Sequence, residues 1–470
     1  MNKLILYLTY IAPLMVLFLL RLLAGFDGLY GQDPYEYYRY TKELVDYFKN
    51  GNHPGDYFWP IGYPLTGAIL NILIPSTSLS LQLVSIISCS IVLIYTNKII
   101  HHIFPNQNKD GKAYLFLFFC LSPFVFRFAI TIMSDMLTLA TLLSGSYYCL
   151  KYIQQGKLWS IILGMLLLGC SIMTRYAVAV LIAPIIAYLI ITMIKQKKHL
   201  WHFPILLIFA FLPMIPHLMI RNDNATQFLF HQWLINWSPM NWFSRSFKTT
   251  EGYNVYKLPN ILYNFLGIFH PRFFVFGMII IALGFKKFKW SSDIKILLIS
   301  VLLYLVFLSG IPFQNNRFLL LTLPFILVIF FQPYNFLRSK FNNRTNNAIT
   351  LVFVFIQLGF CISSFLPVYQ RAILEKKIFD YVIASGEPTV YTMDMDISLK
   401  GRGYSAEIHN IWKEFYAYPD TTAIIIFNTI DYPKQWKGMN PMKNWDHFNK
   451  NYTIQETFKF TNGWKAYEFK

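Results

Sequence analysis

Charged residues are scarce in this chain of 470 residues. They make up 14% of the sequence, whereas hydrophobic residues make up 55%. Soluble globular domains carry about 25% charged residues, because even a large core needs a charged surface. The deficit therefore excludes a soluble globular chain, and the apolar content excludes a disordered one. The low glycine, proline and cysteine counts exclude a collagen or a disulfide-rich scaffold, which leaves a polytopic membrane protein.

Motifs of nucleotide and metal sites are also missing. The sequence has no GxxxxGK[ST] loop, no GxGxxG after a strand and no HExxH. Its five cysteines lie in apolar runs without a CxxC pair, so they imply neither a disulfide framework nor a zinc site. We therefore expect neither an ATP-driven pump nor an enzyme that uses a soluble nucleotide.

What the sequence does have is a series of apolar runs. A spanning helix needs about 20 mostly apolar residues, and eleven runs qualify as candidates. They predict a mainly α-helical membrane protein of about eleven transmembrane helices. The candidate spans are 4–24, 78–97, 113–129, 131–150, 158–173, 176–194, 201–220, 260–284, 295–311, 316–333 and 348–367.

Basic residues are concentrated in every second loop between these runs. Cytoplasmic loops of membrane proteins are rich in lysine and arginine, so the pattern places the N-terminus in the cytoplasm and the C-terminus outside. Most of the net charge of +18 then reflects topology, not nucleic-acid binding. We expect a multi-pass plasma membrane protein, and the outward C-terminus suits a bacterial inner membrane.

Two domains are expected. Residues 1–367 form the membrane domain, and residues 368–470 form a small α/β domain outside the membrane. Within the membrane domain, the outer loops 25–77 and 221–259 are long enough to hold a site. The first loop predicts an amphipathic helix, and both loops carry apolar or aromatic segments that favour the membrane surface.

Shorter elements are expected within the outer segments. The first loop contains the amphipathic helix at 34–49 and an apolar piece at 61–74 that is too short to span. In the α/β domain, helices are expected at 370–384 and 405–417, strands at 389–393 and 422–428, and a hairpin joining 452–460 to 464–469 through a tight Asn-Gly turn.

The stretch GQDPYEYY at 31–38 follows the first span and has two interpretations. In one, Asp33 caps a helix, with Pro34 at the first helical position and Glu36 completing a capping box. In the other, Asp33 is a carboxylate held at the outer membrane surface, where it acts as a general base. The two are compatible, because a catalytic aspartate can also cap a helix.

Other charged side chains lie at the outer ends of the spans. An unpaired carboxylate there costs a few kcal/mol, so Asp135 is expected to be functional or paired, unless it only caps a helix. The arginines either bind a lipid phosphate or lie among ordinary headgroups. They are Arg175, Arg221, Arg272 (next to His270) and Arg317. Weak candidates for a metal site are His53, Asp56 and Asp135, although ordinary loop polarity explains the first two equally well.

Together these motifs resemble those of the GT-C superfamily of polytopic glycosyltransferases. The similar branches are the dolichyl-phosphate-mannose protein mannosyltransferases and the aminoarabinose transferases of lipid A. Five elements match in the same order over about residues 1–195 and, less closely, over 200–330. They are QDPYEYY at 32–38, WPIGYP at 59–64, SDML at 134–137, TR at 174–175 and NRFLLLTLP at 316–324. One departure is that Pro34 stands where the family often has an acidic residue.

The resemblance implies transfer of a monosaccharide from a polyprenyl-phosphate-linked donor, with inversion, to an acceptor at the outer face. Asp33 would be the general base, and Asp135 would orient the acceptor or hold a divalent metal ion, which some relatives use. Positive side chains would stabilise the phosphate as it leaves. The expected substrate-binding residues are Glu36, Tyr37, Tyr63, Arg175, His270, Arg272 and Arg317.

The expected partners are the donor lipid, membrane lipids and an acceptor that is a protein, a lipid or a glycan; nucleic acid is not expected. Three alternatives remain. A transporter or flippase of lipid-linked sugars predicts charges near the middle of the bilayer, whereas here they lie at the outer face. A non-catalytic subunit for assembly of surface polysaccharide predicts that Asp33 can be neutralised. A polysaccharide polymerase or ligase would use an oligosaccharide donor.

Overall fold

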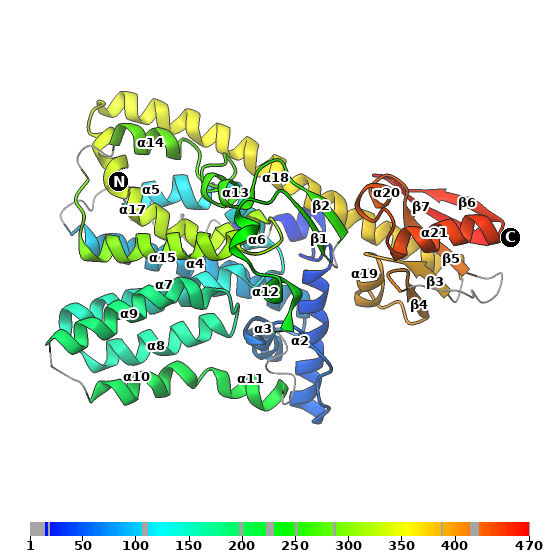
Figure 1. Cartoon of the computed structure of the whole chain (residues 1–470), viewed down its shortest axis with the longest axis horizontal. Helices are drawn as coiled ribbons and strands as arrows, with labels where there is room; N and C mark the ends of the chain where they lie inside the picture. Colours follow the sequence, from blue (N-terminus) through cyan, green and yellow to red (C-terminus); the bar gives the residue numbers. More distant parts are fainter. Residues whose placement is uncertain are drawn as a thin grey trace. The chain divides into compact units, whose positions relative to one another are not determined.

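A computed structural model gives the architecture (Figure 1). The structure describes residues 15–16, 19–105, 111–196, 201–221, 230–249, 252–284, 288–386, 389–413 and 423–469. The chain divides into two compact units, which we call the helical unit and the sheet unit. The helical unit comprises Met1–Gly28, Tyr40–Phe243 and Leu258–Phe365, and the sheet unit comprises Leu29–Arg39, Ser244–Lys257 and Leu366–Lys470.

The helical unit consists of apolar helices joined mostly by short turns. The long helix α18 (Asn343–Ser385) begins in this unit and ends in the sheet unit. Helix α2 (Asp33–Asn50) begins in the sheet unit and ends in the helical unit. The remaining helices are α3 (Gly62–Leu73), α4 (Thr77–Ile103), α5 (Gly111–Leu115), η2 (Phe116–Cys120), α6 (Pro123–Ile130), α7 (Asp135–Gln155), α8 (Leu158–Ile172), α9 (Val178–Gln196), α10 (His202–Phe211), α11 (Met214–Arg221), α12 (Gln232–Ile235), η5 (Pro239–Trp242), α13 (Asn260–Gly267), α14 (Gly277–Gly284), α15 (Ser292–Ser309), α16 (Asn316–Leu319), η7 (Leu320–Thr322) and α17 (Leu323–Arg338).

Several of these helices have the length and composition of membrane spans. Among the described residues, five helices qualify singly, and two further pairs qualify as spans that are bent by 73° and 41°. The five are Thr77–Ile103, Val178–Lys195, Ser292–Ser309, Asn316–Arg338 and Asn343–Ser385. The expected total of eleven stays a prediction, and residues 4–14, 17 and 18 of the first expected span lie outside the described part.

One predicted span is wrong as a continuous helix. Residues 260–284 form α13 and α14, and the nine residues between these two helices are not helical. Pro271 has no backbone N–H to donate, and Phe276 adopts a left-handed backbone with φ of 59°. The break forms a turn that carries His270 and Arg272, both predicted site residues.

Glycines let α7 and α8 pack closely. A Cβ on Gly145 would lie 2.8 Å from the Leu168 side chain and 3.0 Å from the Gly164 carbonyl oxygen. A Cβ on Gly164 would lie 2.8 Å from the sulfur of Cys149. Small residues at such contacts allow helix backbones in membrane proteins to approach each other. This packing brings together the two helices whose ends carry Asp135 and Arg175.

The sheet unit contains a five-stranded sheet in the order β4-β3-β5-β7-β6. Strand β3 is parallel to β4 and β5, and β7 is antiparallel to β5 and β6. All six residues of β5 are buried, which is typical of a central strand. The strands are β3 (Thr389–Thr392), β4 (Glu407–Asn410), β5 (Ala423–Asn428), β6 (Ile454–Lys459) and β7 (Trp464–Phe469), with helices α19 (Asp396–Gly401), α20 (Tyr432–Gln435) and α21 (Asn440–Asn451).

The expected elements of this unit are confirmed only in part. The β6–β7 hairpin is confirmed, with Asn462 and Gly463 at positive φ in its turn. The predicted helix at 405–417 is wrong, because 407–410 instead pairs with β3 as an edge strand, and 414–417 lies outside the described residues. The helix α21 is a further element that the sequence pattern did not reveal.

A second, smaller sheet joins this unit from the expected outer loop 221–259. It is the hairpin of β1 (Ser246–Thr249) and β2 (Gly252–Val255). Gly252 has φ of 97°, and a Cβ there would lie 2.8 Å from the carbonyl oxygen of Gln435 in α20. Only glycine fits both the backbone conformation and this close approach. The hairpin therefore packs directly against the polypeptide that follows β5.

Candidate active site

Three predicted site residues meet in the helical unit. Asp135 is the first residue of α7, Arg175 follows α8, and Arg317 lies in α16. The Asp135 carboxylate is fully buried; Arg317 Nε donates to its Oδ2 at 2.8 Å, and Arg175 Nη1 donates to its Oδ1. The expectation that Asp135 is functional or paired is met by two ion pairs. Ser134, not Asp135, occupies the N-cap position.

The resulting group carries more positive than negative charge. One carboxylate opposes two guanidinium groups, whose side chains are only 14% and 11% exposed. Guanidinium is permanently protonated and matches the geometry of phosphate oxygens. A positive charge held in a poorly hydrated site interacts strongly with an anion. The group of Asp135, Arg175 and Arg317 can therefore bind an anion, and we call it the arginine pair.

Aromatic side chains surround the arginine pair. The Arg175 guanidinium lies 5.3 Å from the centre of the Phe318 ring. Tyr304 in α15 interacts electrostatically with Arg175 and Asp135. Its buried hydroxyl has no hydrogen-bond partner among the described residues. Because a buried unpaired hydroxyl is costly, Tyr304 is a further candidate for ligand contact that sequence reasoning missed, since a tyrosine within an apolar run gives no signal.

The turn that carries Arg175 is held by the WPIGYP segment. The backbone N–H of Gly62 donates to the Met173 carbonyl at 2.7 Å, and Thr174 Oγ1 donates to the Cys170 carbonyl at 2.8 Å. A Cβ on Gly62 would lie 2.5 Å from the Met173 oxygen. Two motifs that are more than 100 residues apart in the sequence thus form one local structure.

Replacing Gly62 with alanine is expected to displace this turn and with it Arg175. The clash is with backbone, so it cannot be relieved by a side-chain rotation. Overpacking of this kind costs about 1–3 kcal/mol, and we expect a lower thermal unfolding temperature and weaker binding of an anion at Arg175. Gly55→Ala is the matched control, because its Cβ would meet no atom closer than 3.7 Å. Equal behaviour of the two variants would contradict the structure.

Three other predicted substrate-binding residues, Tyr63, His270 and Arg272, lie elsewhere in the helical unit. Tyr63 is fully buried, and its hydroxyl donates to the Leu81 carbonyl at 2.9 Å and lies 2.8 Å from Ser85 Oγ. This placement joins α3 to α4. His270 is exposed, and the Arg272 carbonyl accepts a hydrogen bond from Phe124 N at 3.2 Å. Among the described residues, no hydrogen bond or ion pair joins these positions to Asp135.

Asp33 belongs to the sheet unit and begins α2. The N–H groups of Tyr35 and Glu36 both donate to the Gln32 carbonyl, so Gln32 takes the cap position and Asp33 is the first helical residue. The helix thus begins one residue earlier than expected. Asp33 is half-buried, and Tyr37 is buried. Glu36 is paired with Arg39 at 2.8 Å on the same helix, whereas the capping-box interpretation had predicted a bond back to the cap.

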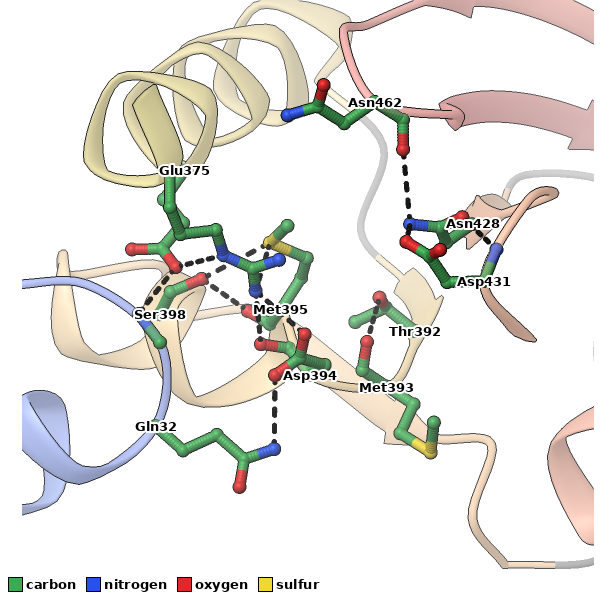
Figure 2. A network of polar contacts seen from close by, with 12 residues as sticks. Gln32, Glu375, Thr392, Met393, Asp394, Met395, Ser398, Asn428, Asp431 and Asn462 are labelled. Atoms are coloured by element: carbon green, nitrogen blue, oxygen red, sulfur yellow. Dashed lines mark hydrogen bonds and ion pairs between the residues drawn. The ribbon is translucent and has the colours of Figure 1, made fainter. Parts of the chain in front are cut away.

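A polar network holds the residues on both sides of Asp33 (Figure 2). The fully buried Glu375 carboxylate accepts from Gly31 N at 2.8 Å and from the Tyr35 hydroxyl at 3.1 Å. Arg371 joins Glu375 to Asp394, at 2.6 Å and 2.8 Å. Gln32 Nε2 also donates to Asp394 Oδ1, at 3.1 Å. The segment that carries Asp33 is therefore fixed from both sides within the sheet unit.

A resident metal ion does not fit this arrangement. Both oxygens of Asp135 accept from arginine, and a cation would have to displace these guanidinium groups. His53 and Asp56 are exposed loop residues. In the described part of the chain, no group of three or more histidine, cysteine, aspartate or glutamate side chains could hold a metal. We therefore derive no catalytic step through a metal.

Comparisons with known proteins identify one family model and several solved structures that this chain resembles. Residues 59–220, which include Asp135 and Arg175, match the family model of dolichyl-phosphate-mannose-protein mannosyltransferase. The structure of ArnT from Cupriavidus metallidurans in the apo state superposes with a TM-score of 0.61 at 11% identity, covering 98% of this chain and 97% of that one. Its complex with undecaprenyl phosphate gives 0.56 at 12% identity, with the same coverage. No curated protein sequence matches.

An archaeal oligosaccharyltransferase, AglB from Archaeoglobus fulgidus, superposes less well. Its TM-score is 0.47 at 11% identity, over 81% of this chain and 60% of that one. The family match and the ArnT fold favour an enzyme over the transporter and the assembly subunit. The family match and the shared fold confirm the predicted resemblance to GT-C membrane glycosyltransferases.

Proposed function

We propose that the enzyme transfers a monosaccharide from a polyprenyl-phosphate-linked donor to an acceptor at the outer face of the membrane. The observation that carries this proposal is the buried Asp135 carboxylate that holds two arginines in an apolar surrounding. Such a group suits a phosphate linked to a lipid. ArnT, whose fold this chain shares, was solved with undecaprenyl phosphate bound.

In this proposal Arg175 and Arg317 bind the phosphate of the donor. As the bond to the sugar breaks, negative charge grows on the phosphate, and preoriented positive groups stabilise it. Asp135 acts through the arginines by fixing their direction, and is thus a positioning residue. This role replaces the expected one, in which Asp135 orients the acceptor or holds a metal.

Asp33 is proposed as the general base. The oxygen of an acceptor hydroxyl attacks the anomeric carbon while the bond from this carbon to the phosphate oxygen breaks, and its electron pair leaves with the polyprenyl phosphate. The hydroxyl proton passes to the Asp33 carboxylate, and in-line attack inverts the anomeric centre. The bonds to Gly31, Gln32 and Tyr35 support this role, because they hold the segment in place.

The proposed location follows the charge pattern of the loops. The N-terminus lies in the cytoplasm, the segments 25–77, 221–259 and 368–470 lie outside, and the donor enters from the outer leaflet of a bacterial inner membrane. Nucleotide sugars are scarce there, which agrees with the lack of a nucleotide motif in the sequence.

Mass spectrometry of cellular lipids tests the proposal. Cells that carry the double variant Arg175→Gln/Arg317→Gln are expected to accumulate one polyprenyl-phosphate sugar that wild-type cells consume, because donor binding is lost. Arg344→Gln, at an exposed position, is the matched control and should leave the lipid profile unchanged. If a folded double variant has the wild-type profile, the arginine pair does not bind the donor and the proposed function fails.

A further inference from the structure

A large cavity lies within the sheet unit, apart from the residues used above for donor binding. Its volume is about 960 Å³, at the upper end of the range of small-molecule sites. The residues that line it come from the β1–β2 hairpin, from the part of α18 in the sheet unit and from the turns that follow β3, β5 and β6. Among them are Lys248, Tyr253, Asp394, Asp431, Lys434 and Lys437.

The cavity lies at a favourable place in the sheet. Asp394 follows β3, and Asn428 ends β5, which is parallel to β3 and next to it. From the end of β3 the chain continues to β4, on one side of these two strands. From the end of β5 it continues to the other side, where β6 and β7 lie. In α/β sheets, ligands bind in the crevice at such a point, outside the carboxyl ends of the strands.

Two lining residues have a left-handed backbone, which aspartate and asparagine tolerate better than other non-glycine residues. Asp394 has φ of 68° and Asn462 has φ of 57°, and among the described residues only Phe276 is a further non-glycine with positive φ. The surroundings hold both (Figure 2). Arg371 and Gln32 bind the Asp394 carboxylate, and Asn428 Nδ2 donates to the Asn462 carbonyl at 3.3 Å. These bonds fix the positions of Asp394 and Asn462 at the cavity.

The turn after β5 is equally well defined. The buried Asn428 accepts through Oδ1 from the N–H groups of Ile430 and Asp431, at 3.0 Å and 2.8 Å. Its Nδ2 donates to Asp431 Oδ2 at 3.1 Å, as Figure 2 shows. Asp431 itself is exposed. The Asn428 amide thus holds the Asp431 carboxylate in a fixed orientation at the cavity. A site that recognises specific hydroxyl groups requires such fixed polar groups.

The lining combines two kinds of chemistry. Carboxylate and amide groups accept from and donate to hydroxyls, and the half-exposed Tyr253 ring offers an apolar face. Three exposed lysines, Lys248, Lys434 and Lys437, lie beside them. Arg371, Glu375 and Asp394 together carry one net negative charge. Asp431 adds a second, and the three lysines exceed this total by one positive charge. The excess charge favours a negatively charged ligand.

We propose that this cavity binds a saccharide that bears a phosphate or a carboxylate group. The hydroxyls of the sugar bind Asp431 and the polar groups around it, and the anionic group binds the lysines. This binding requires neither the donor nor the Asp33 carboxylate, so it can be measured without the transfer reaction. It gives the sheet unit a recognition function of its own.

Saturation-transfer NMR on the purified full-length protein in detergent tests the proposal. The probes are glucose 6-phosphate, glucuronic acid, glucose and inorganic phosphate. We expect both anionic sugars to bind about tenfold more tightly than glucose or phosphate alone, since only they bind the lysines and the hydroxyl-binding groups at once. The same affinity for all four probes, or no binding of either anionic sugar at millimolar concentration, overturns the proposal.

Variants assign the binding to the cavity. Lys434→Gln/Lys437→Gln should reduce the affinity for both anionic sugars to that for glucose, and Asp431→Ala should weaken all three sugars. Lys450→Gln, an exposed position on α21 outside the cavity, is the matched control. Circular dichroism checks that each variant is folded. If folded variants bind as the wild type does, the sugars bind elsewhere and the cavity is not their site.

Discussion

Replacing Asp33 with asparagine is expected to slow sugar transfer by about 10²–10⁴-fold, the usual contribution of a general base. Asparagine keeps the shape of the side chain but cannot accept the proton of the acceptor hydroxyl. The substitution leaves the bonds of Gly31, Gln32 and Tyr35 that fix this segment in place, so we expect the fold to be retained. The measurement is the turnover of purified enzyme in detergent, with the accumulating lipid as donor.

Asp46→Asn is the matched control for this variant. It makes the same chemical change on the same helix, at a half-buried carboxylate that bonds to Asn50 and Asn52. We expect wild-type turnover from it. The loss in Asp33→Asn should appear in kcat, with donor binding unchanged, because the base acts only in the transition state. A turnover within twofold of wild type would show that Asp33 only begins the helix.

The second large effect is expected for stability. Replacing Asp135 with asparagine removes the buried carboxylate that pairs with both Arg175 and Arg317. Removing one partner from a buried ion pair costs about 3–5 kcal/mol, and we expect a loss of this size in the free energy of unfolding, measured by denaturant titration in micelles. Asp380→Asn, at an exposed position, should stay within about 0.5 kcal/mol of wild type.

A double variant separates this effect from a general loss of packing. If Asp135 acts by compensating the arginines, Asp135→Asn/Arg317→Gln should be less destabilised than the sum of the two single variants, because only one unpaired guanidinium remains. Groups in direct contact show coupling of about 0.5–3 kcal/mol. Strict additivity would mean that the ion pairs seen at Asp135 do not contribute to folding.

The sequence allowed the residues of the arginine pair to be predicted singly, but not their association. Asp135, Arg175 and Arg317 each stand out because a charge next to an apolar run is costly. That the one carboxylate holds both guanidinium groups depends on how α7, α8 and α16 pack, which local patterns do not encode. The same limit applies to Gly62, whose contact with Met173 is made between two distant turns.

The sheet unit was less predictable. The β6–β7 hairpin follows from its Asn-Gly turn, and the buried strand β5 follows from its apolar run. Strand β4 was mistaken for part of a helix, because edge strands are short and mostly polar and derive their hydrogen bonds from a neighbour. Arg371 and Glu375 have the spacing of an ordinary surface pair, so nothing in the sequence reveals that Glu375 is buried and binds Gly31.

Three separate stretches of chain build the sheet unit, and this restricts how it can be inherited or engineered. A fragment that begins at residue 368 would lack Gly31 and Tyr35, two of the groups that satisfy the Glu375 carboxylate. It would also lack the hairpin that packs on Gln435 through Gly252. Recombination at a single junction therefore cannot exchange the whole unit between proteins. Changes in its specificity must instead arise by substitution in place, accompanied by changes in the loops between the membrane helices.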